Sequence, residues 1–145
     1  MAEVEVFLED TPVLRVRADW KAGGPPAAFN RLESNLPTLK GRKFYGIFKA
    51  SPEGEEYFAC VARIESDDPE AMHLEEGLIP GGWYARRKLL NWEEDVSNIG
   101  KIFDEMANKC KVDGERQSIE FYRSQIEVLL YLPIQRLGSS STPAR

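Results

Sequence analysis

Apolar residues recur along this chain at two spacings, which predict strands and helices in a definite order. Every second residue is apolar from Leu14 to Trp20, and this alternation is typical of a strand with one buried face. From Phe29 to Leu36, and again from Val96 to Cys110, the spacing is helical instead. We expect the strands over residues 3–9, 13–20, 42–50, 56–65, 80–90, 117–122 and 125–134.

The predicted elements form two halves with the same order of strand, helix, strand and strand. The halves span about residues 1–65 and 78–136, and the polar, acidic stretch over 66–77 is typical of a surface linker. Two such modules predict an α+β fold with a mostly antiparallel sheet, two helices on one face and a ligand cleft on the other. We expect one domain over residues 1–136 and a disordered polar tail over 137–145.

Two short phrases predict local geometry. Asn91 followed by Glu94 is typical of a helix start, where the first side chain caps the helix and the acidic one returns a hydrogen bond. Gly81 and Gly82 open a strand and not a helix, which argues against a phosphate-binding loop. We interpret them as a bend that lets the backbone approach a neighbour.

Composition narrows the class of protein. The chain has 145 residues, of which 42% are hydrophobic and 30% charged, and its net charge is −5. Basic residues are scattered among acidic ones, so we expect no direct binding of nucleic acid. The acidic N-terminal segment is unlike a signal peptide and no apolar run is long enough to span a membrane, so we expect a cytoplasmic protein.

The metal-binding residue types are sparse. Cys60 and Cys110 lie far apart in apolar surroundings, which predicts two buried structural thiols. His73 is the single histidine, and it lies in the acidic stretch. We therefore expect no metal site and no cofactor, and we expect a monomer.

Glu120 is the sharpest candidate for chemistry. Strand alternation places Glu120 and Tyr122 on one face, with Ile119 and Phe121 on the other. Because the apolar pair suits contact with helices, we expect Glu120 and Tyr122 to face the open cleft. A carboxylate there could bind a cationic ligand or act as a general base on water. The alternative is a surface glutamate, or one paired with an arginine such as Arg86 or Arg123.

Aromatic residues on the predicted strands add candidates for the cleft lining. We expect Tyr45, Tyr57, Trp83 and Trp92 to line it together with Tyr122. Aromatic rings stack on flat ligands, and their faces attract cations. The alternative for each of them is an ordinary place in the hydrophobic core.

Three phrases of the sequence resemble the GyrI-like (gyrase-inhibitor-like) family. They are YFACVARI from Tyr57 to Ile64, LIPGGWYARRKL from Leu78 to Leu89, and SIEFYRSQIEVLLYLPI from Ser118 to Ile134. The third resembles that family's closing hairpin, in which an acidic residue stands two positions before a tyrosine. The likeness runs in order over about residues 4–135, although the family often has a glycine where this chain reads Leu-Leu-Asn-Trp over 89–92.

The resemblance implies the doubled module described above and a relation to effector-binding domains of AraC- and MerR-type transcription regulators. This chain has no helix-turn-helix segment, so we expect a stand-alone protein and not a one-component regulator. The resemblance implies a pocket for lipophilic, drug-like and in part cationic compounds, with Glu120 at its centre. Two alternatives stay open. One is a hydrolase of reactive xenobiotics with Glu120 as general base and Tyr122 orienting or protonating the substrate, and the other is a gyrase-inhibitor-type protein-interaction module.

Overall fold

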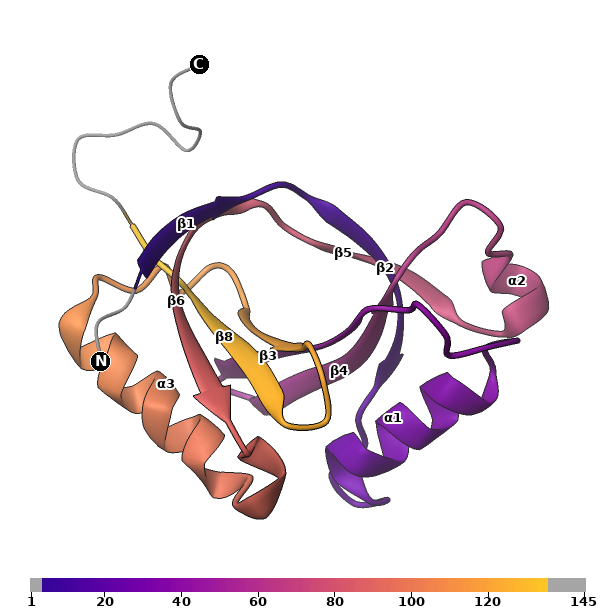
Figure 1. Cartoon of the computed structure of the whole chain (residues 1–145), viewed down its shortest axis with the longest axis horizontal. Helices are drawn as coiled ribbons and strands as arrows, with labels where there is room; N and C mark the ends of the chain where they lie inside the picture. The colour runs from indigo at the N-terminus through magenta and orange to yellow at the C-terminus, as the bar shows by residue number, and fades with distance from the viewer. Residues whose placement is uncertain (1–3, 136–145) are drawn as a thin grey trace. The chain divides into compact units, whose positions relative to one another are not determined.

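The computed structural model describes residues 4–135, which divide into two compact units (Figure 1). Unit 1 comprises residues 4–10 and 80–135, and unit 2 comprises residues 11–79. The polar tail predicted over 137–145 lies outside the described residues. This division differs from the halves expected along the chain, because the first strand pairs with a strand of the C-terminal half.

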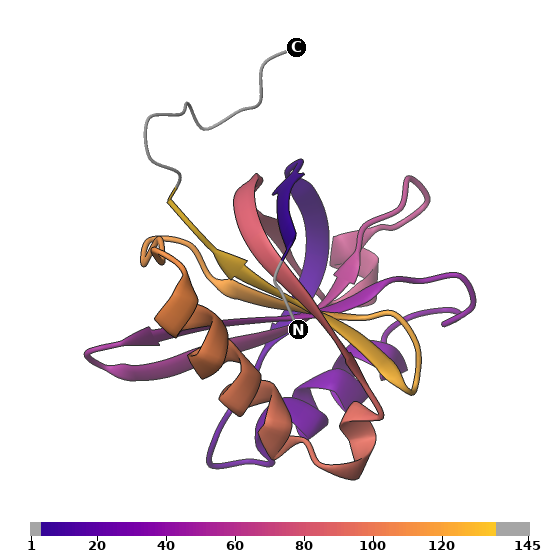
Figure 2. The ribbon, with the colours of Figure 1, turned by 60° about the vertical axis from the view of Figure 1, so that its left-hand side comes forward.

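Unit 1 is a four-stranded antiparallel sheet with one long helix on it (Figure 2). Helix α3 buries Ile99 and Met106 against Ala85, Val128 and Leu130 of the sheet. The strand order is β1-β6-β8-β7. The elements are β1 (Val4–Leu8), β6 (Gly82–Leu90), the 3-10 turn η1 (Trp92–Glu94), α3 (Ser97–Lys109), β7 (Ser118–Tyr122) and β8 (Glu127–Pro133).

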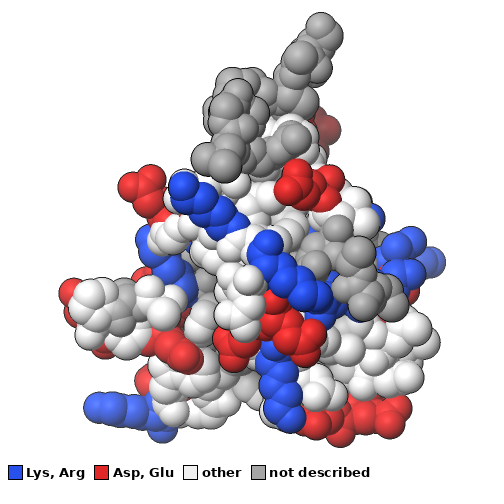
Figure 3. All heavy atoms as spheres, turned by 90° about the vertical axis from the view of Figure 1, so that its left-hand side faces the viewer, with Lys and Arg blue, Asp and Glu red and all other residues white. Residues whose placement is uncertain are grey.

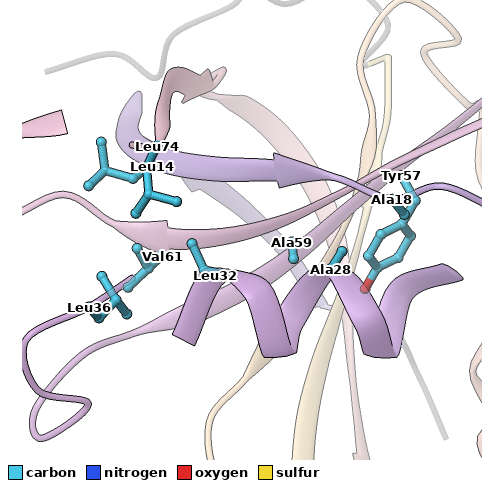
Figure 4. Packing of buried hydrophobic residues seen from close by; sticks show 9 residues of the cluster. All are labelled: Leu14, Ala18, Ala28, Leu32, Leu36, Tyr57, Ala59, Val61 and Leu74. Atoms are coloured by element: carbon cyan, nitrogen blue, oxygen red, sulfur yellow. The ribbon is translucent and has the colours of Figure 1, made fainter. Parts of the chain in front are cut away.

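Unit 2 repeats this plan. Ala28 and Leu32 of its helix pack on Leu14, Ala59 and Val61 of its sheet (Figure 4). The strand order is β3-β4-β2-β5, all antiparallel. The elements are β2 (Thr11–Arg17), α1 (Gly24–Ser34), β3 (Phe44–Ser51), β4 (Gly54–Ala62), the short helix α2 (Pro69–Met72) and β5 (Glu75–Ile79).

Compared one with the other, the two units have the same topology, with β6, α3, β7 and β8 in the places of β2, α1, β3 and β4. The α+β fold with duplicated, antiparallel modules is therefore confirmed. Among the described residues, no helix is long and apolar enough to cross a membrane.

The stretch predicted to be a linker contains a helix and most of a strand that hydrophobic alternation did not indicate. Strand β5 begins with two acids, and Glu75 and Glu76 form ion pairs with Arg15 and Arg63. A β-carbon on Gly77 would lie 2.7 Å from Cδ of Arg15, so glycine leaves room for that side chain. Strand β5 thus forms by backbone pairing with β2, and the exposed ion pairs accompany this pairing. Apolar spacing indicates neither of them.

The start of α3 also differs from the prediction. Asn91 has φ +57° and makes no capping bond, and it begins the 3-10 turn η1 instead. Asp95 caps α3 instead. Its Oδ1 accepts from the backbone N–H of Ser97 at 3.1 Å and from the Ser97 hydroxyl. This bonding lowers the pKa of Asp95, chiefly through the Ser97 hydroxyl. The helix begins six residues later than Asn91.

The two glycines before β6 lie where the backbone passes close to a neighbour, as predicted. A β-carbon on Gly81 would lie 2.5 Å from the Leu8 carbonyl oxygen and 2.8 Å from the Asp10 nitrogen. The Gly81 N–H donates to Oδ1 of Asp10 at 2.6 Å. Gly82 has φ +140°, and a β-carbon there would meet the Arg116 guanidinium at 2.5 Å. Both positions therefore require glycine.

A buried ion pair holds two loops of unit 2 together. Arg42 and Asp67 bond at 2.7 Å, and each side chain is only 4% exposed. Arg42 also donates to the Ala62 carbonyl at 3.1 Å, and Asp67 accepts from the Ile64 N–H at 3.0 Å. The pair thereby fixes the end of β4 to the loop that enters β3.

The cysteines match the prediction in part. Cys60 is fully buried in β4, and burial raises the pKa of its thiol to about 12. Cys110 is only half-buried, at the end of α3.

We expect Gly81→Ala to lower the free energy of unfolding by about 1–3 kcal/mol, because the added methyl group would collide with backbone atoms that cannot move independently. The matched control is Gly114→Ala, where a β-carbon would meet nothing within 4 Å. Urea unfolding of both variants measures the difference. Equal stabilities for the two variants would contradict the close approach at Gly81.

We expect Asp67→Asn to cost roughly 3–5 kcal/mol, because it leaves the Arg42 charge buried without its counter-ion. The control is Glu56→Gln, which breaks the exposed pair with Arg17 and should cost no more than about 1 kcal/mol. Thermal and urea unfolding measure both. A loss at Asp67 as small as that at Glu56 would show that the buried pair does not hold the loops.

Candidate functional site

Glu120 lies on the face of the unit 1 sheet that carries α3. It stands opposite Leu130 on the neighbouring strand, and Tyr122 stands opposite Val128. Directly opposed residues of an antiparallel pair share a face, and Val128 and Leu130 pack in the cluster that contains Ile99 of α3. The prediction that Glu120 and Tyr122 face away from the helix is therefore wrong.

The prediction failed because both faces of β7 are buried. Ile119, on the other face, is 1% exposed and stands opposite the buried Tyr131. Apolar character at Ile119 and Phe121 therefore did not identify the helix side. The sheet of unit 1 has a helix-facing surface that includes a carboxylate.

Three of the predicted site residues form one cluster. The Tyr122 hydroxyl donates to Oε1 of Glu120 at 2.5 Å. The rings of Tyr122 and Trp92 meet edge to face, with centroids 5.0 Å apart. The Trp92 indole N–H donates to the Ser124 carbonyl at 3.3 Å, which ties η1 to the turn between β7 and β8. We call Glu120, Tyr122 and Trp92 the Glu120 cluster.

Local structure explains this arrangement. Residues two apart on a strand point to the same side, so β7 presents the carboxylate and the phenol together. Trp92 reaches Tyr122 because η1 turns back over the hairpin at the end of β6. Glu120 is 9% exposed, and Tyr122 and Trp92 are half-buried. The cluster is a buried carboxylate bonded to Tyr122, whose ring in turn contacts Trp92.

Arg87 is a second charged residue on the same face, and the sequence analysis missed it. It stands opposite Leu130, which in turn stands opposite Glu120, so the three form one row across the sheet. Two strand spacings put the α-carbons of Arg87 and Glu120 about 10 Å apart. Arg87 is 9% exposed and bonds Glu105 of α3 at 2.8 Å. Its place among the apolar helix-facing residues of β6 was the signal that could have identified it.

The arginines considered as alternative partners of Glu120 have other positions. Arg86 stands opposite Tyr131 and thus lies on the face away from α3. Arg123 bonds Glu127 at 3.5 Å.

Trp83 and the two tyrosines of unit 2 have aromatic or strand neighbours other than Glu120, Tyr122 and Trp92. Trp83 lies on the α3 face of β6, edge to face with Phe7 at 5.5 Å. Tyr57 is buried beneath α1, where its ring meets Phe29 at 6.3 Å. Tyr45 stands opposite Cys60 and so lies on the other face of the unit 2 sheet from Tyr57. The two tyrosines therefore cannot line one site on a single face of that sheet.

Charge is mixed over the surface. On the face drawn in Figure 3, the described acidic and basic side chains are interspersed and form no broad basic area. Within residues 4–135, no group of three His, Cys, Asp or Glu side chains is placed to share a metal ion.

Comparisons with known proteins give a likeness of fold. No protein-family model and no curated protein matches the sequence. Among solved structures, an integron cassette protein from the mobile metagenome of Vibrio cholerae is 13% identical, with a TM-score of 0.70 over 92% of this chain and 96% of that one. A hydrolase from Listeria innocua is 11% identical, with a TM-score of 0.59 over 92% of each chain.

The third similar structure contains a ligand. It is the protein SAV2435 bound to tetraphenylphosphonium, 10% identical to this chain, with a TM-score of 0.61 over 94% of this chain and 96% of that one. At such low identity the likeness concerns the fold alone. The chain has the GyrI-like fold that the three phrases of its sequence predicted.

Proposed function

We propose that this protein binds lipophilic, cationic small molecules at the Glu120 cluster. The observation that carries the proposal is a carboxylate only 9% exposed and hydrogen-bonded to Tyr122, whose ring contacts Trp92. A carboxylate so deeply buried has lost much of its hydration. A cation in contact with it gains Coulomb energy that water would otherwise screen, because the effective dielectric constant there is low.

The aromatic rings would contact the lipophilic part of the ligand. Tyr122 and Trp92 offer apolar surface beside the charge, and ring faces attract cations. The fold that this chain shares with SAV2435, a protein seen with the lipophilic cation tetraphenylphosphonium, supports the same ligand class. Contacts from Trp83, Tyr45 and Tyr57 remain predictions. We further propose that the protein acts in the cytoplasm as a monomer, which rests on its sequence composition.

We expect tetraphenylphosphonium to raise the melting temperature of the wild-type protein. At a ligand concentration of about 100 times Kd, the gain of roughly 2.7 kcal/mol corresponds to a shift of about 5–10 °C. Glu120→Gln keeps the shape of the side chain and removes its charge, so the shift should fall to near zero. Thermal-shift assays and isothermal titration calorimetry measure the two quantities independently.

Two controls make this test specific. Glu115→Gln removes one exposed acidic charge from the same unit and should leave the shift unchanged. The neutral triphenylphosphine oxide, added to the wild-type protein, reports on apolar contact without the charge. An equal shift in the wild-type and Glu120→Gln proteins would contradict the proposal, and so would an equal loss in both glutamine variants.

Hydrolysis of an electrophilic compound is a second candidate, favoured by the 2.5 Å hydrogen bond between Tyr122 and Glu120. Glu120 would take a proton from water while the water oxygen bonds to a ring carbon of a strained substrate such as an epoxide. The carbon–oxygen bond of the ring breaks, and Tyr122 gives its proton to the oxygen that leaves. Glu120 then returns its proton to Tyr122, so one water molecule is added in total. A Listeria innocua hydrolase has the same fold.

Turnover separates this candidate from binding alone. If the protein is a hydrolase, styrene oxide should be converted to the diol, and Glu120→Gln should slow the reaction by about 10²–10⁴-fold. Tyr122→Phe tests the proton donor, and Glu115→Gln is again the matched control. Saturable binding of tetraphenylphosphonium with no diol formed above the uncatalysed rate would reject the hydrolase and leave the binding function.

A further inference from the structure

The segment between β6 and α3 has a single side chain that is not fully exposed. In residues 91–97 every residue is exposed except Trp92, which is half-buried. Asn91 begins the segment with φ +57°, and the 3-10 turn η1 follows it. A segment with so little buried surface opens at a lower cost in free energy than the sheet and the helix that it connects. We call residues 91–96 the Trp92 strap.

Two hydrogen bonds attach the Trp92 strap to the turn between β7 and β8. The Asn91 N–H donates to the Ile126 carbonyl at 2.5 Å, and the Trp92 indole N–H donates to the Ser124 carbonyl at 3.3 Å. In the described part of the chain, the other hydrogen bonds of the strap run within it or to the start of α3. The turn is braced separately, because the Ser124 hydroxyl accepts from the N–H groups of Ile126 and Glu127. The strap can therefore move as one piece while the turn stays in place.

Trp92 restrains the side chain that bonds Glu120. The Tyr122 hydroxyl donates to Oε1 of Glu120, and the Tyr122 ring meets Trp92 edge to face at 5.0 Å. A cation that binds the Glu120 carboxylate competes with this hydroxyl, and the hydroxyl moves away only if the Tyr122 ring turns. The Trp92 ring packs against the Tyr122 ring and opposes that turn. Movement of the strap would remove the restraint.

We propose that the Trp92 strap is a gate that opens to admit the ligand to Glu120, with Trp92 as a positioning residue that acts through Tyr122. The inference rests on the function proposed for the Glu120 cluster and adds the control of access to it. A carboxylate on a residue that is 9% exposed cannot meet a bulky cation while every neighbour keeps its place. Tyr122 belongs to a strand paired with β8, whereas Trp92 belongs to the exposed strap, so the strap is the part that moves.

Unit 2 contains an equivalent tryptophan that supplies a matched control. The Trp20 indole N–H donates to the Glu55 carbonyl at 2.9 Å, and its ring meets Tyr57 edge to face at 6.5 Å. Trp20→Phe therefore makes the same chemical change as Trp92→Phe, at a tryptophan that packs on a different tyrosine. In both variants an aromatic ring is kept and an indole N–H donor is removed.

The test measures the binding rates of rhodamine 6G, a fluorescent lipophilic cation, by stopped-flow anisotropy. We expect Trp92→Phe to raise kon and koff together, each by about two- to tenfold, the effect of losing one hydrogen bond that keeps the strap closed. Loss of a ligand contact would raise koff alone. Trp20→Phe should leave both rates as in the wild type. Circular dichroism and thermal unfolding verify that the variants are folded.

Tyr122→Phe tests whether Trp92 acts through Tyr122. This change removes the hydroxyl that has to leave Glu120, so kon should rise. In that background Trp92→Phe should raise kon little further, because the ring that Trp92 restrains no longer occupies the carboxylate. A double variant in which the two accelerations multiply in full would overturn the positioning role.

The outcomes separate the gate from the binding function. Rhodamine 6G binding that is the same in the wild-type and Glu120→Gln proteins would overturn binding at Glu120, and the gate with it. Binding that requires Glu120 but keeps wild-type rates in a folded Trp92→Phe protein would overturn the gate alone, and so would a rise in koff without a rise in kon. Hydrogen exchange of the wild type gives a second measurement, in which the Asn91 amide should exchange faster than the amides of β8. Equal exchange rates would also overturn the gate.

Discussion

The packing of one amphipathic helix on one face of a four-stranded sheet is the contact on which each unit depends. An isolated helix of the length of α1 or α3 is marginal in water, so its apolar side must be buried to hold it. The sheet supplies the complementary surface, at Ala59 and Val61 beneath α1 and at Val128 and Leu130 beneath α3. Residues that face the helix are thereby removed from water. A charged side chain among them loses hydration and needs hydrogen-bond or ionic partners.

Comparison of the two units shows what the helix-facing side can hold, because they share a topology but differ in the charge of the residues beneath the helix. In each unit a tryptophan follows the strand that precedes the long helix, β2 or β6. Its indole N–H donates to a backbone carbonyl of the hairpin that follows the helix: Trp20 to Glu55, and Trp92 to Ser124. Both set that tryptophan edge to face with a tyrosine. Only unit 1 adds a carboxylate to the helix-facing side of its first hairpin strand. The scaffold is common to both units, and Glu120 adds a buried carboxylate to one of them.

The candidate site was predictable where it depends on neighbours in the chain. Glu120 and Tyr122 share a face because strand geometry requires it, and Trp92 was among the aromatics expected beside them. The face itself was mistaken, because apolar residues cover both sides of β7 and helical contact is only one way to bury them. Arg87 has the same strand parity as Trp83, Ala85 and Leu89, which indicates its face, but its ion-pair partner Glu105 lies on a different element.

The sequence by itself determined the α+β class, the repeated module, most strands, both long helices and the close approach at Gly81. These follow from periodicity and from steric limits that act within a few residues. Only the tertiary structure decided that β1 pairs with β6, that a polar segment becomes β5, and that Asp95 and not Asn91 caps α3. The first two depend on partners far along the chain, through strand pairing and through ion pairs with Arg15 and Arg63. The cap is a local bond from Ser97 to Asp95, but η1, which separates it from Asn91, is held to the distant Ser124 by Trp92. The spacing of apolar residues does not identify partners far along the chain. The face of the sheet on which Glu120 lies therefore followed only from the tertiary structure.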